Sequence, residues 1–201
     1  MALTGVPVAS VAVLEGYGVL TGIPGQDQRA RALDVFERMY SPAIGTGATM
    51  DYLGRTGLDA LKGADILKTA ADSYSSTVEY AATPIAQSLR GMAQVILKGL
   101  GTRVLYTSQG GYDTHANQVP VQTPLLSDLS AGIGDFFTDL REHDAADNVM
   151  MLVFTEFGRR VKDNGSGSDH GSGGASYLIG QPVNGGMLGA YPSLKEEDQL
   201  D

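Results

Sequence analysis

The stretch RVLYTSQGGYDTHANQ, residues 103–118, decides the fold and introduces the question of function. Its first seven residues, RVLYTSQ, contain the apolar run VLYT and predict a strand, and two glycines follow directly. Asp113 and His115 then come one residue apart. We therefore expect a carboxylate and an imidazole at the carboxyl end of a strand.

A helix and two further strands are expected after this stretch. Apolar residues recur at helical spacing from Leu125 to Leu140, and the apolar run VMMLVFT, residues 149–155, predicts the next strand. SYLIG, residues 176–180, predicts another strand. A strand, a long helix and a strand suggest a right-handed crossover with parallel strands. The expected fold class is therefore α/β, with a mainly parallel sheet flanked by helices.

The preceding part of the chain is expected to be an accessory region. VASVAVL, residues 8–14, predicts a strand, and apolar spacing predicts a helix from Asp27 to Tyr40 that Pro42 stops. One or two helices are expected between residues 50 and 80. A further helix should begin at Pro84, after Thr83 as its capping residue, and end near Gly99.

These elements predict one α/β domain over residues 1–201, made of the strand and helical region in 1–82 and a core in 83–201. The chain is 42% hydrophobic, which suffices for a core, and its net charge of -9 disfavours nucleic acid as a partner. It has no cysteine, so disulfides and thiol nucleophiles are excluded. The apolar N-terminal run is interrupted too early for a membrane span.

The two pairs Asp113/His115 and Asp169/His170 are the candidate metal ligands. The second pair lies in the glycine-rich stretch GSGSDHGSGG, residues 165–174. Imidazole nitrogen and carboxylate oxygen are common ligands of divalent metals. The carboxyl ends of neighbouring strands meet at one sheet edge, which would bring the pairs together. The alternatives are a turn in which Asp113 caps the backbone, and a flexible surface loop.

Three further residues follow the strand predicted over residues 149–155. Glu156 stands at its carboxyl end and is a candidate ligand, and Arg159 could bind an anionic group by its forked guanidinium. An ion pair of Glu156 with Arg159 or Arg160 at the start of a helix is the structural alternative. His143 follows the helix among charged residues, which favours a solvated residue without a part in the site.

The motifs GGYDTH, TEFGR and DHG, in this order, carry a family resemblance. With the surrounding residues 89–118 and 125–171, and with GGMLGAYPSL, residues 185–194, they resemble the DUF1501 family. This is a group of uncharacterised bacterial proteins placed in the alkaline phosphatase and sulfatase superfamily. The resemblance is strong from about residue 84 to residue 194 and looser before it.

The resemblance implies a phosphatase- or sulfatase-like core with metal ligands at strand ends. Asp113 and His115 match one metal position, and His170 matches the later histidine of that site. Glu156 falls where the superfamily has an Asp-His pair for a second metal, and Phe157 replaces that histidine. A single or altered metal site is therefore expected, with zinc as the first choice and manganese or calcium as alternatives.

The function implied is hydrolysis of small phosphate or sulfate esters, with Arg159 as the catalytic residue that binds the anion. The superfamily's nucleophile is expected upstream of Met1, which predicts that this chain is the C-terminal portion of a longer protein and that residues 1–201 form an incomplete α/β domain. Twin-arginine export signals are common in the family and suggest a periplasmic or extracellular full-length protein. A non-catalytic exported binding or surface protein with the same fold is the alternative.

Overall fold

The computed structural model describes residues 23, 25–58, 73–191 and 193–195. Contacts between Cα atoms divide the chain into two units. One unit holds the described residues up to Ser75 together with Gln94–Leu105, and the other holds Ser76–Ala93 and the described residues from Tyr106 onward. The strand expected over residues 8–14 lies outside the described part of the chain.

The first unit contains the expected accessory helices. Helix α1, Gln26–Tyr40, is followed by the 3-10 helix η1, Ser41–Ala43, so the α-helix ends just before Pro42 as predicted. A second helical segment covers residues 48–58. It approaches α1 at Gly57, where an added Cβ would lie 3.2 Å from the Tyr40 ring. Residues 59–72, where another helix was possible, lie outside the described part.

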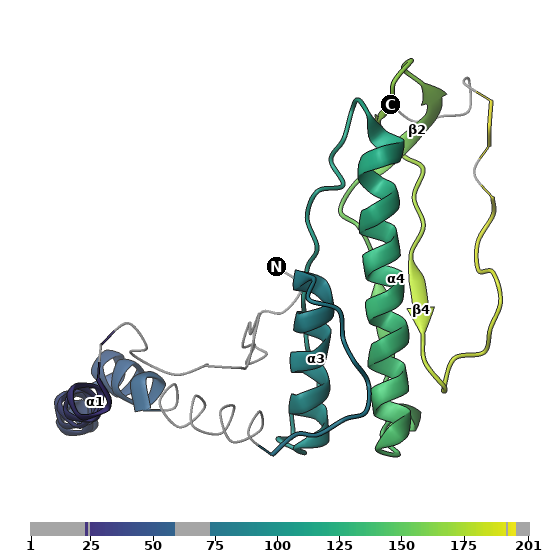
Figure 1. Ribbon diagram of the computed structural model, residues 1–201. Coiled ribbons are helices and arrows are strands. Elements are labelled where there is room, and N and C mark those ends of the chain that lie inside the picture. Colours follow the sequence, from purple (N-terminus) through teal and green to yellow (C-terminus); the bar gives the residue numbers. More distant parts are fainter. Residues whose placement is uncertain (1–22, 24, 59–72, 192, 196–201) are drawn as a thin grey trace. The chain divides into compact units, whose positions relative to one another are not determined.

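Two long helices lie side by side in Figure 1: α3, Pro84–Leu97, and α4, Gln118–Glu142. Helix α3 begins at the predicted proline, whereas α4 begins seven residues before the apolar pattern that predicted it. The helices come close at Gly132, where an added Cβ would meet Cδ1 of Leu89 at 3.2 Å. The apolar core of the second unit lies between them and includes Ile85, Ala86, Leu89, Phe136, Phe137 and Leu140.

The carboxyl end of α4 is tied to the chain segment that precedes α3. The Tyr80 hydroxyl donates to Oδ2 of the fully buried Asp139 at 2.9 Å. Glu142 accepts hydrogen bonds from the backbone N–H of Thr77 at 3.0 Å, from its hydroxyl at 2.9 Å and from the Ser76 hydroxyl at 3.1 Å. We call this last group of bonds the Glu142 clasp.

The strands of the described residues form two antiparallel pairs. Strand β1, Met151–Val153, pairs with β4, Tyr177–Ile179. Strand β2, Gly158–Asp163, pairs with β3, Ser168–Gly171. The strands predicted over residues 149–155 and 176–180 are therefore present. The fold is mixed α/β, and the hairpin between β1 and β4 turns the chain back so that β4 runs opposite to β1.

The residues 103–109, which were predicted to form a strand, are not part of a paired strand. From Tyr106 to Gln109 the side chains alternate between exposed and partly buried, the period-two pattern of an extended chain. An extended segment becomes a strand only through backbone pairing, and the ladders among the described residues join only β1 with β4 and β2 with β3. The described residues therefore do not show the expected parallel crossover around α4.

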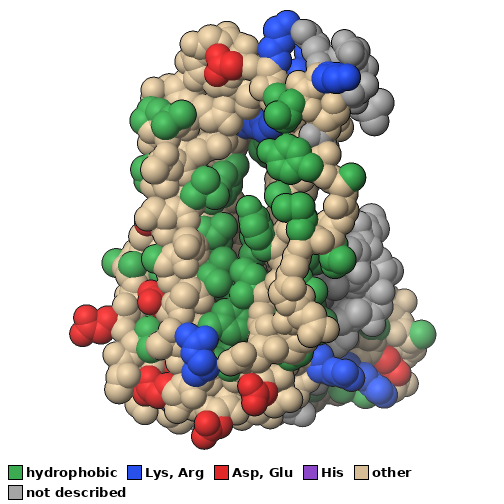
Figure 2. Space-filling model, turned by 90° about the vertical axis from the view of Figure 1, so that its right-hand side faces the viewer, with side chains coloured by type: hydrophobic (Ala, Val, Ile, Leu, Met, Phe, Trp, Pro, Cys, Tyr) green, Lys and Arg blue, Asp and Glu red, His purple; other side chains and the backbone are tan. Residues whose placement is uncertain are grey.

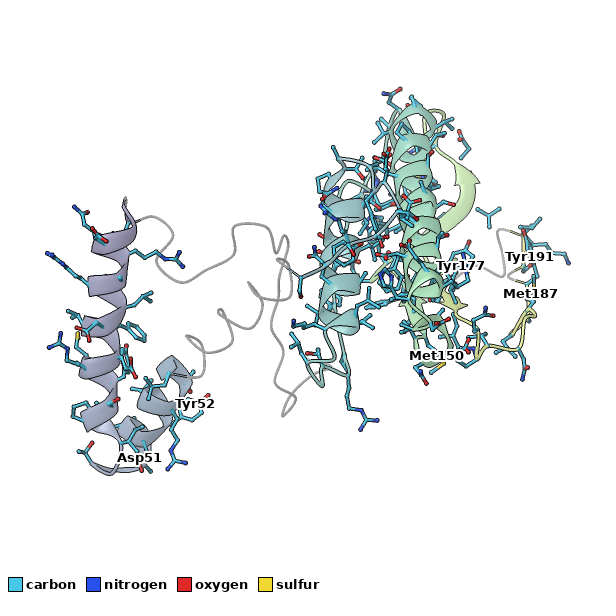
Figure 3. All side chains as sticks on the ribbon, turned by 60° about the horizontal axis from the view of Figure 1, so that its bottom comes forward. Asp51, Tyr52, Met150, Tyr177, Met187 and Tyr191 are labelled. Atoms are coloured by element: carbon cyan, nitrogen blue, oxygen red, sulfur yellow. The ribbon has the colours of Figure 1, made fainter. Side chains whose placement is uncertain are left out.

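Apolar side chains remain exposed in the second unit. Met150, Leu152 and Phe154 alternate along β1 and its flanks and are 62%, 59% and 58% exposed, so they share one uncovered face. Figure 2 shows hydrophobic side chains gathered around a hollow on one face of the molecule. In Figure 3, Met150 and Tyr177 lie at separate places along the β1–β4 pair, while Met187 and Tyr191 lie on the C-terminal segment. No helix of the described residues is long and apolar enough to cross a membrane.

Candidate metal centre

The candidate site is built from the loop before α4 and from the β2–β3 hairpin. In Figure 1, β2 lies at the end of α4 where that helix begins. The backbone N–H of Asn117 donates to Oγ of Ser166 in the hairpin turn at 2.9 Å. Nδ2 of Asn164, in the same turn, donates to the carbonyl of His115 at 2.9 Å. These bonds join two segments that are 49 positions apart in the chain.

Asp169 and His170 lie on strand β3 and not in the flexible loop considered from the sequence. Two glycines let the strands approach: an added Cβ at Gly158 would lie 2.5 Å from the carbonyl oxygen of Gly171. Gly158 and Gly171 therefore allow the close approach of β2 and β3. The sequence signal for this hairpin is Asn164-Gly165 at its turn, a pair that favours tight turns between strands.

Asp113, His115 and His170 form one cluster. Each offers a ligand atom, and these atoms lie within 4.8 Å of one another. Nε2 of His170 is 2.7 Å from Oδ1 of Asp113, and Nε2 of His115 is 3.3 Å from the same oxygen. The two imidazole rings are 4.8 Å apart between centroids. The side chains are about half exposed, so a small molecule can reach the cluster from solvent.

Asp169 contacts the other face of the cluster. Its Oδ1 lies 3.0 Å from Nδ1 of His115 and accepts a hydrogen bond from Nδ2 of Asn164 at 3.0 Å. The sequence suggested Asp169 as a ligand. In the structure its carboxylate contacts Nδ1 of His115, the ring nitrogen that points away from Asp113. A carboxylate in this place fixes the orientation and tautomer of a metal-binding histidine.

The histidines keep both carboxylates in the ionised form. The hydrogen bond with His170 is the largest cause that lowers the pKa of Asp113, and the nearby His115 ring acts in the same direction. The pKa of Asp169 is lowered first by its hydrogen bond with His115 and then by that with Asn164. Both groups are therefore anionic at neutral pH. A carboxylate in this form can bind a metal ion or orient a histidine ligand.

The three side chains of the cluster could hold a small divalent cation. A neutral His115 that donates Nδ1–H to Asp169 turns the lone pair of Nε2 toward Asp113. Nε2 of His115 and Oδ1 of Asp113 are 3.3 Å apart, and two ligand atoms of a tetrahedral zinc ion are also about 3.3 Å apart. The 2.7 Å pair of His170 and Asp113 is a hydrogen bond and would have to open by about 0.6 Å. Three protein ligands leave one position for water or substrate.

Phe157 supports His170. The two rings are stacked, with centroids 4.5 Å apart and planes inclined by 25°. Phe157 thus fixes the plane of the ring of a candidate ligand. The sequence indicated only that Phe157 cannot bind a metal. Its stacking on His170 could not be predicted, because the two residues are brought together only by the β2–β3 hairpin.

Arg159 is occupied by backbone carbonyls. Its Nη1 donates to the carbonyl of Thr114 at 2.7 Å and to that of Ser168, and its Nη2 donates to the carbonyl of Tyr112 at 2.7 Å. The guanidinium therefore faces the protein backbone, which disfavours the anion-binding role expected from the sequence. Arg159 and Arg160 lie on β2, so the helix start considered for them is absent.

Glu156 and His143 lie outside the three-residue cluster. Glu156 is exposed immediately before Phe157. His143 caps the carboxyl end of α4, where its Nδ1 lies 2.9 Å from the carbonyl and 3.2 Å from Oδ1 of Asp139. His143 therefore belongs to the packing at that helix end, as a residue without a part in the site.

A family model described as "Protein of unknown function (DUF1501)" matches residues 45–200. This match covers most of the chain, and the protein belongs to the DUF1501 family. No curated protein and no solved structure matches the chain. The matched residues include the loop and the hairpin that carry the candidate metal ligands.

Proposed function

We propose that Asp113, His115 and His170 bind one divalent metal ion, with zinc as the first choice and manganese or calcium as alternatives. The convergence of the three side chains around Oδ1 of Asp113 supports this proposal most directly. Asp169 would orient His115 and Phe157 would orient His170. Glu156 is outside the cluster, so we propose a single metal ion.

The proposed activity is hydrolysis of small phosphate or sulfate esters. It rests on the resemblance of the DUF1501 motifs to the alkaline phosphatase and sulfatase superfamily, and the proposal includes that superfamily's mainly parallel sheet. The period-two burial of residues 106–109 is compatible with a strand of such a sheet.

The chain's own residues would bind and orient the substrate at the cluster. Without a cation, the carboxylates of Asp113 and Asp169 repel an anionic ester. A bound divalent ion would reverse the local charge and supply Lewis acidity at the ester oxygen. His115 and His170 would stay neutral to act as ligands, held by Asp169 and Phe157, and their half-exposed position leaves room for the ester.

A second function is a binding or surface protein that keeps the metal site without turnover. The observation that favours it is Phe157, which occupies the position of a superfamily metal ligand and stacks on His170 instead. Such a protein would bind the ion and an anion without cleaving an ester.

Calorimetric titration with zinc, together with ester assays, tests both functions. We expect one zinc ion per chain and an affinity that falls as the pH drops through the histidine range, because protons compete for imidazole nitrogen. Aryl phosphate and aryl sulfate should be assayed with this chain and with the longest gene product that carries it. Zinc-dependent turnover supports the hydrolase, zinc binding without turnover supports the binding protein, and absence of zinc, manganese and calcium binding overturns both.

A further inference from the structure

The guanidinium of Arg159 lies between the two segments that carry the candidate ligands. Two of its acceptors, the carbonyls of Tyr112 and Thr114, flank Asp113, and Thr114 directly precedes His115. Its third acceptor, the carbonyl of Ser168, directly precedes Asp169. One side chain therefore fixes the backbone on both sides of the cluster.

The backbone of Arg159 is fixed as well. In the β2–β3 ladder it lies opposite His170, and its N–H donates to the carbonyl of Gly173 at 2.7 Å. Its Cζ lies 5.1 Å from the centroid of the Phe157 ring, which stacks on His170. Arg159 thus pairs with His170 through its backbone, and its side chain contacts Phe157, which stacks on His170.

We propose that Arg159 is the positioning residue of the site, which holds the Asp113/His115 loop and the β3 strand at the separation that a metal ion requires. A planar guanidinium has several donors in a fixed fork and can bond carbonyls of two segments at once. A lysine ammonium carries its donors on one nitrogen and cannot keep this geometry. The inference about metal affinity rests on the proposed function, whereas the joining of the two segments does not.

Two substitutions separate positioning from anion binding. Arg159→Lys keeps the charge that an anion needs but loses the fork, and Arg159→Met loses both. Arg141→Met is the matched control, because Arg141 lies at the end of α4 and donates to Thr138. Amide hydrogen exchange of residues 112–118 and 158–173 reports the joining of the segments without metal, and exchange of residues 130–140 in α4 reports global unfolding.

We expect both Arg159 variants to exchange faster in residues 112–118 and 158–173, with α4 unchanged, and to bind zinc about 10- to 100-fold more weakly, the usual loss for an outer support of a metal ligand. Arg141→Met should behave as the wild type. If α4 also exchanges faster in the methionine variant, the lysine variant carries the test.

Three other outcomes have distinct meanings. Wild-type exchange and wild-type zinc affinity in both variants would overturn the positioning role. Loss of inorganic phosphate binding in Arg159→Met but not in Arg159→Lys, with unchanged exchange, would assign Arg159 to the anion instead. Faster exchange in the variants of a protein that binds no metal even as wild type would keep the positioning role and reject the proposed metal site.

Discussion

The Nδ1 atom of His115 lies 3.0 Å from Oδ1 of Asp169, on the side of the ring opposite to Asp113. This relationship divides the two aspartates of the site by role. Asp113 faces the point where the candidate ligand atoms converge, whereas Asp169 contacts Nδ1 of the His115 ring and orients that ring.

Asp169→Asn should weaken zinc binding by about 10- to 100-fold without abolishing it, because the amide removes the charge that orients His115. Asp113→Ala removes a proposed ligand and should weaken zinc binding more strongly than Asp169→Asn. Asp163→Asn is the matched control on the same hairpin, where Asp163 accepts from the Gly165 N–H at 2.6 Å. Calorimetric zinc titration of the three variants checks the order, and equal losses in Asp169→Asn and Asp163→Asn would contradict it.

His170→Ala should remove the thermal stabilisation that zinc gives. An ion that binds only the folded chain stabilises it by about 2.7 kcal/mol at a free concentration 100 times the Kd. The melting temperature with and without zinc should therefore differ in the wild type and coincide in His170→Ala. His143→Ala should shift both melting curves together and keep their difference. A zinc shift lost equally in both histidine variants would place the site elsewhere.

The Glu142 clasp predicts a loss of stability in acid. The Thr77 N–H, followed by its hydroxyl, lowers the pKa of Glu142 from its ordinary value of 4.5. The clasp therefore stabilises the fold above about pH 4.5, and this contribution is lost as the pH falls through the lowered pKa of the folded state. Melting curves from pH 3 to 6 should show a gap between wild type and Glu142→Gln that closes in acid. Asp144→Asn, an exposed neighbour, should keep a constant offset, and parallel curves for Glu142→Gln would contradict the clasp.

Two glycines of α4 predict opposite effects of the same substitution. An added Cβ at Gly134 meets nothing within 4 Å, whereas one at Gly132 meets Cδ1 of Leu89 at 3.2 Å and Cα of Ala86 at 3.5 Å. Gly134→Leu should stabilise the helix by up to about 1 kcal/mol, and Gly132→Leu should cost about 1–3 kcal/mol through overpacking. Urea denaturation measures both free energies of unfolding. A stable Gly132→Leu variant would mean that α3 and α4 do not pack as described.

The sequence predicted the helices well because their signals are local. Pro84 and the apolar spacing of α3 are visible within one turn or two, and Pro42 marks the end of α1. The direction of strand pairing is not local. VMMLVFT predicts a strand but does not say whether its partner is the segment before α4 or the one after the hairpin, and the structure pairs it with Tyr177–Ile179.

The sequence named residues that the structure brings into one cluster, but it did not predict their contacts. Asp-x-His and Asp-His pairs at the ends of apolar runs suggested Asp113, His115 and His170, which the structure brings together. The sequence could not show that Asp169 faces the second nitrogen of His115, because that depends on the turn at Asn164. Nor could it show that backbone carbonyls occupy Arg159, since carbonyls are present at every residue and only the fold selects them.

The distance along the chain between Asp113 and His170, 57 positions, has a consequence for folding. Closing so long a loop has an entropic cost that only the assembled helices and hairpin can offset. We therefore expect the ligand cluster to be completed late, after α4 and the β2–β3 hairpin have formed. A metal ion added to the unfolded chain meets only the separate local pairs Asp113/His115 and Asp169/His170. Metal uptake would thus mark the end of folding, and would not guide its beginning.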